Sequence, residues 1–353
     1  MPLYSIEKDV TSLKIIKPYA YPIYDNKNIS QKIEICGRTC YRSEDKITDT
    51  SSVKFVQNMI KHKHTAMLEH ATLYLRINKI PARMMKMWLT EIKFGTKYDN
   101  ITPYINMTTV DDNTYFSCSL RTMLAIFERY FETYCGTGVS NSGIEAVYKI
   151  VTNKYPNIFN RETMNFELNI SPRIEKIMLF ENPSDFIRDI KTYIENKNDA
   201  NNAIMKHVTH SIAFICDRGV THEFVRHRPA SFAQESTRYC NYTKDKFDNE
   251  ITVIEPFFYK DREKEYDAWF NSCETAEKEY FKLIKNGSTP QEARSVLPNS
   301  LKTQLIITAT ESEWQHIVNL RYKGSTGSPH PQIKEVMESA MPFLKEMSEY
   351  RIS

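Results

Sequence analysis

The sequence of 353 residues predicts an α+β fold. Apolar residues recur at helical spacing in several long segments, and short runs rich in β-branched and aromatic residues are typical of strands. Two capping boxes, each a hydroxyl residue followed three positions later by glutamate, open helices late in the chain. The length allows a substantial core, either in two domains or in one domain with a large insertion.

The elements of the first part of the chain follow from these patterns. Strands are expected at residues 13–16, 71–77 and 207–215. Helices are expected at residues 51–62, 81–88, 120–134 and 183–193. Pro81 fits the first position of its helix, whose core-facing residues would be Met84, Met85, Met87 and Trp88. Asn182 is a typical N-cap before Pro183, and the polar residues 195–202 indicate a connector.

The last third is better punctuated. A helix over residues 217–228 would deliver a basic cluster, and a long amphipathic helix over 263–285 ends at Asn286-Gly287. The capping box Thr289–Glu292 precedes a strand at 301–308, and a second capping box spans Thr310–Glu313. On the helix that follows, Arg321 lies seven residues after Trp314 and so falls on or beside the apolar face. A buried arginine is costly unless an anion or acceptor meets it, and the alternative is an arginine that reaches the helix edge.

Composition limits the classes of function. The chain has 47 basic and 44 acidic residues, a formal charge of +3, which is too balanced for a general nucleic-acid binder. It has no long apolar run and no signal-peptide core at its start, so we expect a cytoplasmic protein with no membrane partner. Seven cysteines without Cys-x-x-Cys spacing argue against a disulfide framework or a zinc ribbon.

The most informative segment is Arg226-His227-Arg228, followed after seven residues by Ser236 and then by Arg238. Arginine forks match phosphate geometry, and a serine hydroxyl beside free backbone N–H groups completes an anion site. Pro229 places the cluster where a helix gives way to a loop. The alternative is a solvated basic turn.

This segment resembles the signature of the flavin-dependent thymidylate synthases. Further segments are similar to that family, in the family's order. They are Gly37-Arg38-Thr39-Cys40-Tyr41-Arg42-Ser43, His64-Thr65-Ala66-Met67-Leu68-Glu69-His70, Ala293-Arg294-Ser295-Val296-Leu297-Pro298, and Trp314 with Leu320-Arg321. The resemblance implies a mainly antiparallel central sheet flanked by helices, with an added helical segment. It divides the chain into an N-terminal catalytic part at 1–93, a mainly helical insertion at 94–205, and a C-terminal catalytic part at 206–353.

The resemblance also implies an activity. Such an enzyme is a homotetramer that converts dUMP to dTMP, taking the carbon from methylenetetrahydrofolate while NADPH reduces FAD. Arg321 matches the catalytic arginine that polarises the uracil ring. The expected dUMP-binding residues are Glu223, Arg226, Gln234, Glu235, Ser236, Thr237, Arg238, Arg294 and Arg321. The expected FAD-binding residues are His64, Thr65, Arg226, His227, Arg228, Gln234, His316 and Arg121.

Arg121 enters this set because of a departure from the family. Thr310 and Ser312 stand where the family often has the asparagine and arginine that contact FAD. Arg121 has a similar sequence setting, and we expect it to take over a contact with the flavin phosphates. Ser236 is expected to bind substrate, since no serine-hydrolase elbow accompanies it, and Cys240 is expected to be a packed thiol.

Two alternatives remain open. One is a regulator that binds dUMP and has lost flavin chemistry, which the residues at 310 and 312 would allow. The other is a metal-dependent hydrolase that uses His62, His64 and His70, although no acidic metal signature accompanies them. The sequence otherwise indicates no metal.

Overall fold

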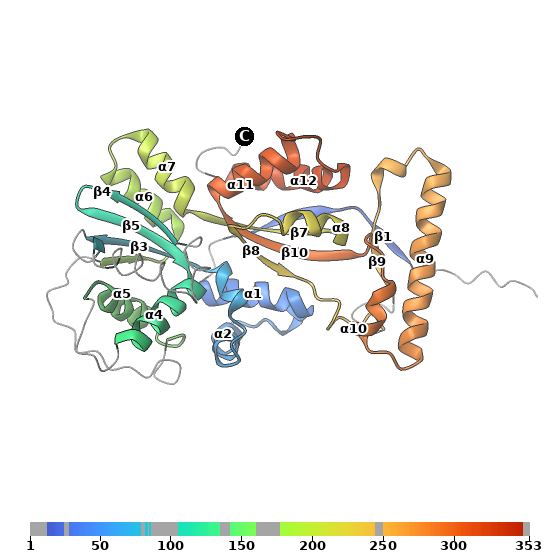
Figure 1. Cartoon of the computed structure of the whole chain (residues 1–353), viewed down its shortest axis with the longest axis horizontal. Helices are drawn as coiled ribbons and strands as arrows, with labels where there is room; N and C mark the ends of the chain where they lie inside the picture. The colour runs from blue at the N-terminus through green and yellow to red at the C-terminus, as the bar shows by residue number, and fades with distance from the viewer. Residues whose placement is uncertain are drawn as a thin grey trace, which may run out of the picture.

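The computed structural model describes residues 13–24, 28–78, 82, 83, 85, 105–134, 142–159, 177–243 and 250–348. It is an α+β structure with antiparallel sheets flanked by helices, which confirms the predicted fold class (Figure 1). Of the helix predicted at 81–88, Pro81, Met84, Met87 and Trp88 lie outside the described residues.

The central sheet has the strand order β2-β7-β10-β8 and is antiparallel throughout. Its strands are β2 (Tyr19–Ile23), β7 (Thr209–Asp217), β10 (Lys302–Thr310) and β8 (Ala230–Gln234). The two nine-residue strands β7 and β10 pair along their whole length. Both are buried on both faces, and this explains why their sequences are apolar without strict alternation.

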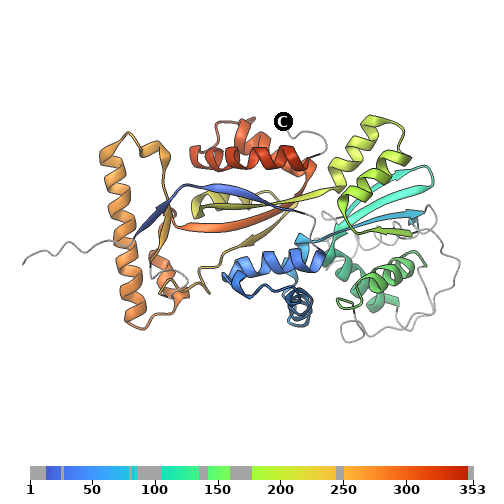
Figure 2. The same cartoon turned by 180° about the vertical axis from the view of Figure 1, so that it is seen from behind.

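Helices cover both faces of this sheet, as the two views in Figures 1 and 2 show. One face packs on α1 (Ile29–Tyr41), with α2 (Ser51–Lys61) and the 3-10 turns η1 (Glu44–Lys46) and η2 (Thr65–His70) beyond it. The other face packs on α8 (Arg218–Phe224), α11 (Glu311–Val318) and α12 (Pro331–Met347). Trp314 on α11 is fully buried in this second core.

A second antiparallel sheet has the order β4-β5-β3-β6. Its strands are β4 (Ile105–Val110), β5 (Asn113–Ser119), β3 (Thr72–Asn78) and β6 (Ile177–Phe180). Two helices, α4 (Leu120–Tyr134) and α5 (Ser142–Lys154), pack on one face, and α6 (Pro183–Tyr193) and α7 (Lys197–His207) pack on the other. Three strands from the region 94–205 thus share a sheet with β3, while the proposed domain boundaries stay a prediction.

The far end of the molecule carries a smaller unit. Strand β1 (Lys14–Ile16) pairs in parallel with β9 (Thr252–Ile254). The 23-residue helix α9 (Glu263–Lys285) has the predicted bounds. The turn η5 (Phe257–Tyr259) precedes α9, and α10 (Pro290–Ala293) and η6 (Arg294–Val296) follow it. The predicted capping box at the start of α10 is confirmed, because the Glu292 carboxylate accepts a 2.8 Å hydrogen bond from the Thr289 amide.

Two predictions of local structure were wrong. Residues 195–202 are not a connector, because most of them lie in α7, whose N-cap Asn196 accepts hydrogen bonds from the amides of Asn198 and Asp199. The segment looked polar because only a narrow stripe, which includes Ala203 and Ile204, faces the core. The helix predicted over 217–228 ends at Phe224.

Within the described residues, no helix combines the length and the apolar character that crossing a bilayer requires.

Candidate functional site

The signature spans a helix, a turn and a strand. The Asp217 carboxylate caps α8 by accepting a 2.8 Å hydrogen bond from the Val220 amide. After α8 ends, the turn carries Arg226 and Arg228 with exposed side chains, while His227 between them is buried. The predicted change from helix to loop is confirmed, but it comes before the basic residues. Five of the seven residues between Arg228 and Ser236 form strand β8.

Arg321 is the centre of a compact polar group. It lies in the π-helical turn η7 (Asn319–Lys323) that follows α11, with its side chain 18 % exposed. Its Nη1 donates to the Glu223 carboxylate at 2.9 Å, and its Nη2 donates to the Glu223 carbonyl at 3.1 Å. Its Nε donates to Nε2 of His227 at 3.2 Å. The costly arginine predicted beside the apolar face therefore meets acceptors from α8 and from the signature.

The opposite side of His227 faces α11. Its Nδ1 lies 3.2 Å from the Glu313 carboxylate, and its ring meets the exposed His316 ring edge to face at 5.5 Å. The potential ligand atoms of His227, Glu313 and His316 all lie within 4.8 Å of one another. A cation at this cluster would replace the proton between Nδ1 and Glu313, and the Arg321 guanidinium across the imidazole ring would repel it. The arrangement therefore favours a hydrogen-bond network over a metal site.

A second group lies beyond the other end of β8. The Ser236 amide donates to the Cys40 carbonyl at 3.0 Å, and the Ser236 hydroxyl accepts from the Arg238 amide at 3.3 Å. Arg294 donates to the buried Thr237 hydroxyl at 3.5 Å. The guanidinium groups of Arg238 and Arg294 are exposed. In the described part of the chain, no histidine or carboxylate contacts the Ser236 hydroxyl, which fits a binding role better than a nucleophilic one.

Gln234 and Glu235 point to opposite faces of the central sheet. The Gln234 amide donates to the Thr221 hydroxyl at 3.0 Å, on the α8 side. The Glu235 carboxylate is buried on the α1 side and pairs with the Lys302 ammonium at 2.8 Å. A strand rises about 3.3 Å per residue, so β8 separates the Arg321 group from the Ser236 group by about 16 Å. The predicted dUMP residues thus form two groups in one chain.

A cavity of about 200 Å³ lies beside the Arg321 group. Its walls include Pro229 of the signature turn and Glu313, together with Thr310 and Ser312, the positions that depart from the family pattern. Glu69 lines the same cavity and pairs with Arg121, whose side chain is 48 % exposed. Arg121 is therefore joined through Glu69 to the same cavity that Thr310 and Ser312 line.

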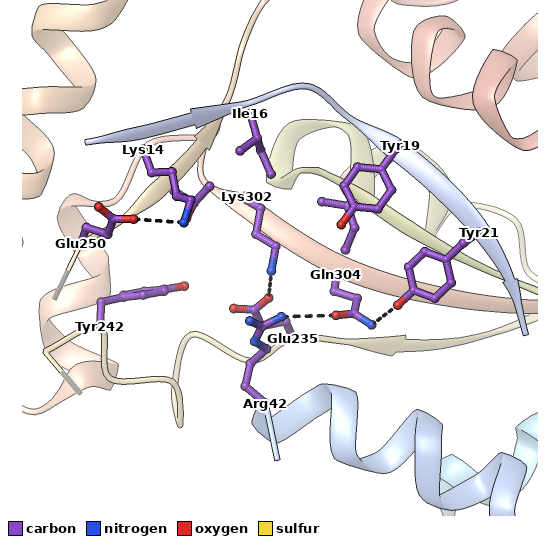
Figure 3. Close-up of a pocket in the computed structure, with 12 residues that line it drawn as sticks. Lys14, Ile16, Tyr19, Tyr21, Arg42, Glu235, Tyr242, Glu250, Lys302 and Gln304 are labelled. Carbon is purple, nitrogen blue, oxygen red and sulfur yellow. Dashed lines mark hydrogen bonds and ion pairs between the residues drawn. The ribbon is translucent and has the colours of Figure 1, made fainter. Parts of the chain in front are cut away.

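A second cavity, of about 260 Å³, lies on the α1 side of the central sheet, where Glu235 beside Ser236 lines it. Figure 3 shows its internal pairs: Lys302 with Glu235, Lys14 with Glu250 at 3.4 Å, and Arg42 with the Gln304 amide oxygen at 3.4 Å. The Gln304 amide also donates to the Tyr21 hydroxyl at 2.8 Å. The lining carries three cationic side chains, Lys14, Arg42 and Lys302, and two carboxylates, each of which pairs with a lysine.

The three histidines of the hydrolase alternative do not meet. His62 and His64 are exposed with their rings 6.4 Å apart, and Thr65 beside them is half-buried at the start of η2. His70 is fully buried, and its Nδ1 bonds the Thr308 hydroxyl at 2.7 Å. Burial lowers the pKa of His70 to about 3, so this ring is neutral at physiological pH. The contacts of His70 are those of a core histidine.

Cys36, Cys40 and Cys240 are poor nucleophiles. Cys240 is completely buried, as predicted for a packed thiol. Burial raises the pKa of Cys40 to about 11 and that of Cys36 to about 12. The thiolate is the reactive form, so neither side chain reacts readily at neutral pH.

Glu313 is the functional candidate that sequence reasoning missed. The sequence placed Glu313 in a capping box, and its backbone amide does donate a hydrogen bond to the Thr310 hydroxyl at 3.3 Å. Its side chain instead turns to His227, 86 residues earlier. The available signal was the spacing of Glu313 and His316, three residues apart on one helix face.

Comparison with known proteins identifies the family. The family model described as thymidylate synthase complementing protein matches residues 23–91 and 147–348. The chain belongs to this family. Among similar proteins are flavin-dependent thymidylate synthases. Those of Pyrococcus abyssi and Pyrococcus furiosus are 32% and 34% identical over 120 residues, which are 34% of this chain and 48% of each relative. The enzyme of Corynebacterium aurimucosum is 23% identical over 186 residues, covering 48% of this chain and 71% of that protein.

The chain spans about half the length of the first two of these relatives. Among solved structures, a UMP/dUMP methylase PolB from Streptomyces cacaoi bound with 5-Br UMP is similar with a TM-score of 0.36 and 19% identity. That match covers 46% of this chain and 79% of the other. A likeness of this size carries no argument about the site.

Proposed function

We propose that this family member is a flavin-dependent thymidylate synthase that converts dUMP to dTMP. Methylenetetrahydrofolate would supply the carbon, and NADPH would reduce FAD. The observation that carries the proposal is the three-point attachment of Arg321 to Glu223 and His227, at the start of the family signature. Family membership and the similarity to named thymidylate synthases support it.

Arg321 would act on the pyrimidine. A guanidinium has five N–H groups, and the bonds to Glu223 and His227 use three of them. Two N–H groups then remain to donate to a pyrimidine carbonyl, where they would stabilise negative charge that develops during activation. Such stabilisation is effective because the cation is already fixed before the reaction. Glu223, predicted to bind dUMP, would contribute by holding Arg321.

The Ser236 group would bind the phosphate of dUMP. Arg238 and Arg294 present exposed guanidinium groups beside the Ser236 hydroxyl and the buried Thr237. Guanidinium forks bind phosphate in a bidentate way, and the backbone turn at Ser236 adds a hydroxyl. Glu235 would serve a supporting role, since its carboxylate is held by Lys302.

We place FAD beside the 200 Å³ cavity, whose lining combines hydroxyl side chains with the carboxylates of Glu69 and Glu313. Arg226 and Arg228 are exposed on the turn whose Pro229 lines this cavity. Arg121 pairs with Glu69, which also lines the cavity. These cations would hold the diphosphate, and His64, Thr65, Gln234 and His316 remain predicted contacts. When bound, FAD supplies the reducing chemistry that no side chain of this site can supply. The protein residues would bind, orient and exclude water.

A homotetramer would bring the two substrate groups together. Within one chain β8 keeps them about 16 Å apart, so a complete site would combine the Arg321 group of one copy with the Ser236 group of another. Mixing Arg321→Ala and Arg294→Ala proteins, unfolding and refolding them together, tests this. Recovery of activity that neither variant shows alone supports a shared site. Activity that stays absent in well-folded mixed oligomers contradicts it.

The decisive experiment is an anaerobic assay of dTMP formation from dUMP, methylenetetrahydrofolate and NADPH after reconstitution with FAD. The wild-type protein should show flavin absorbance and form dTMP. Arg321→Ala should lose activity about a hundredfold or more while retaining FAD. A protein that binds dUMP but neither FAD nor NADPH would instead be the regulator. The reason to test for this outcome is that Thr310 and Ser312 replace residues that often contact FAD in the family.

A further inference from the structure

His227 is buried, and each of its ring nitrogens contacts a group that can only donate or only accept a hydrogen bond. Its side chain is 3 % exposed, between the turn after α8 and the helix α11. Nε2 lies 3.2 Å from Nε of Arg321, and Nδ1 lies 3.2 Å from the Glu313 carboxylate. The Glu313 side chain is 12 % exposed, so this contact is largely shielded from water.

These neighbours determine where the imidazole proton lies. Nε of Arg321 carries a hydrogen and no lone pair, so Nε2 of His227 must accept. A neutral imidazole that accepts at Nε2 carries its proton at Nδ1. That proton faces Glu313, whose ionised carboxylate can only accept. Donors and acceptors match at both nitrogens in this tautomer alone.

Other protonation states fail at Arg321. A proton on Nε2 would face the N–H of Arg321, and a charged imidazolium would add repulsion between two cations. The charged and titratable groups around His227 are Arg321 from η7, Glu313 and His316 from α11, Glu223 from α8 through Arg321, and Arg226 and Arg228 on its own turn. Of these, Glu313 and Arg321 contact the ring nitrogens.

We propose that Glu313 is a positioning residue that acts on Arg321 through His227. By accepting the Nδ1 proton, Glu313 holds the ring so that its Nε2 lone pair fixes Nε of Arg321. Glu223 fixes the other edge of the guanidinium. The two N–H groups left for a ligand, one on Nη1 and one on Nη2, are then held in fixed positions. The tautomer follows from the geometry, whereas its effect on turnover rests on the proposed function.

The tautomer is tested by ¹⁵N NMR of protein labelled at histidine, because protonated and unprotonated ring nitrogens give well-separated signals. The His227 signals are identified by their loss in His227→Gln. Wild-type protein should show Nδ1 protonated and Nε2 unprotonated. Protonation of Nε2 at neutral pH would overturn the proposal, and this result does not depend on whether the protein turns over dUMP.

A matched pair of variants tests the role of Glu313. Glu313→Gln keeps an oxygen acceptor of the same reach, whereas Glu313→Met has a similar volume and no acceptor of comparable strength. Both leave the Thr310 cap intact, since that bond uses the backbone amide of residue 313. Glu313→Met should lower kcat about ten- to a hundredfold with a smaller change in KM for dUMP, and His227 should lose its single tautomer.

Glu313→Gln should stay within about threefold of wild type and keep the Nδ1-protonated signal. Equal damage in both variants, or normal kcat and an unchanged tautomer in Glu313→Met, would overturn the positioning role. Circular dichroism and urea unfolding of both variants separate these outcomes from a failure to fold. If wild type shows no turnover at all, the proposed activity fails, and the NMR comparison still tests the contact of Glu313 with His227.

Discussion

The burial of His207 against the second sheet predicts how the stability of the protein depends on pH. It ends α7 and is fully buried, with Nδ1 at 2.9 Å from the Ser117 hydroxyl and Nε2 at 2.9 Å from the Thr108 hydroxyl. The ring also meets the Phe186 ring at 5.6 Å. Burial, together with the nearby Lys206 charge, lowers the pKa of His207 to about 3. The folded protein therefore holds this ring neutral.

The direction of the pH effect follows from this shift. In the unfolded chain a histidine has a pKa of about 6.5, so below that pH the unfolded state binds a proton that the folded state rejects. The stability contributed by neutral His207 is fully present above about pH 6.5 and is lost progressively as pH falls towards 3. At pH 5, about 1.5 units below the unfolded pKa, the loss is about 2 kcal/mol.

The assay is urea unfolding at pH 7.5 and pH 5.0 of wild type, His207→Gln and the control His62→Gln. His62 is exposed, so its replacement should leave the pH dependence unchanged. Between the two pH values, wild type should lose about 2 kcal/mol more of its free energy of unfolding than His207→Gln. The buried His70 contributes equally to all three proteins and cancels. The same pH dependence in His207→Gln and wild type would refute the argument.

Three further substitutions give separate tests. Gly37→Ala places a Cβ 2.5 Å from the Phe55 ring and should lower the free energy of unfolding by about 1–3 kcal/mol, measured by thermal unfolding. An unchanged Tm would mean that the ring moves aside freely. Asn28→Ala removes the capping box of α1 and should cost about 1 kcal/mol by urea unfolding, with no loss if the cap is made in solution by water. Arg121→Ala should weaken FAD binding in a flavin titration and spare dUMP, and the reverse pattern contradicts its proposed role.

The sequence predicted the elements whose signals are local. Helix α9 has the predicted bounds because its apolar stripe and its Asn286-Gly287 end lie within one segment. The end of α8 depends on distant chain, since the Glu223 carbonyl in its last turn accepts a hydrogen bond from Arg321. No pattern near Phe224 carries that information.

The same limit applies to the site. The Arg321 position was predicted from helical spacing, and its acceptors were not, because they lie 94 and 98 residues away along the chain. Glu313 was hidden for the same reason, as its backbone and its side chain serve different partners. The resemblance identified individual residues, whereas the division into two groups became visible only once the intervening residues were known to form β8.

The strand within the signature explains why its gap has a fixed length. Neighbouring side chains on β8 alternate between faces, so Gln234 reaches Thr221 on one side while Glu235 reaches Lys302 on the other. Adding or deleting one residue would exchange these faces and place a carboxylate against the α8 side. The number of residues in the gap therefore sets both the distance between its ends and the face on which each side chain lies. Only a change by two residues, with a new register against β10, would keep each side chain on its own face.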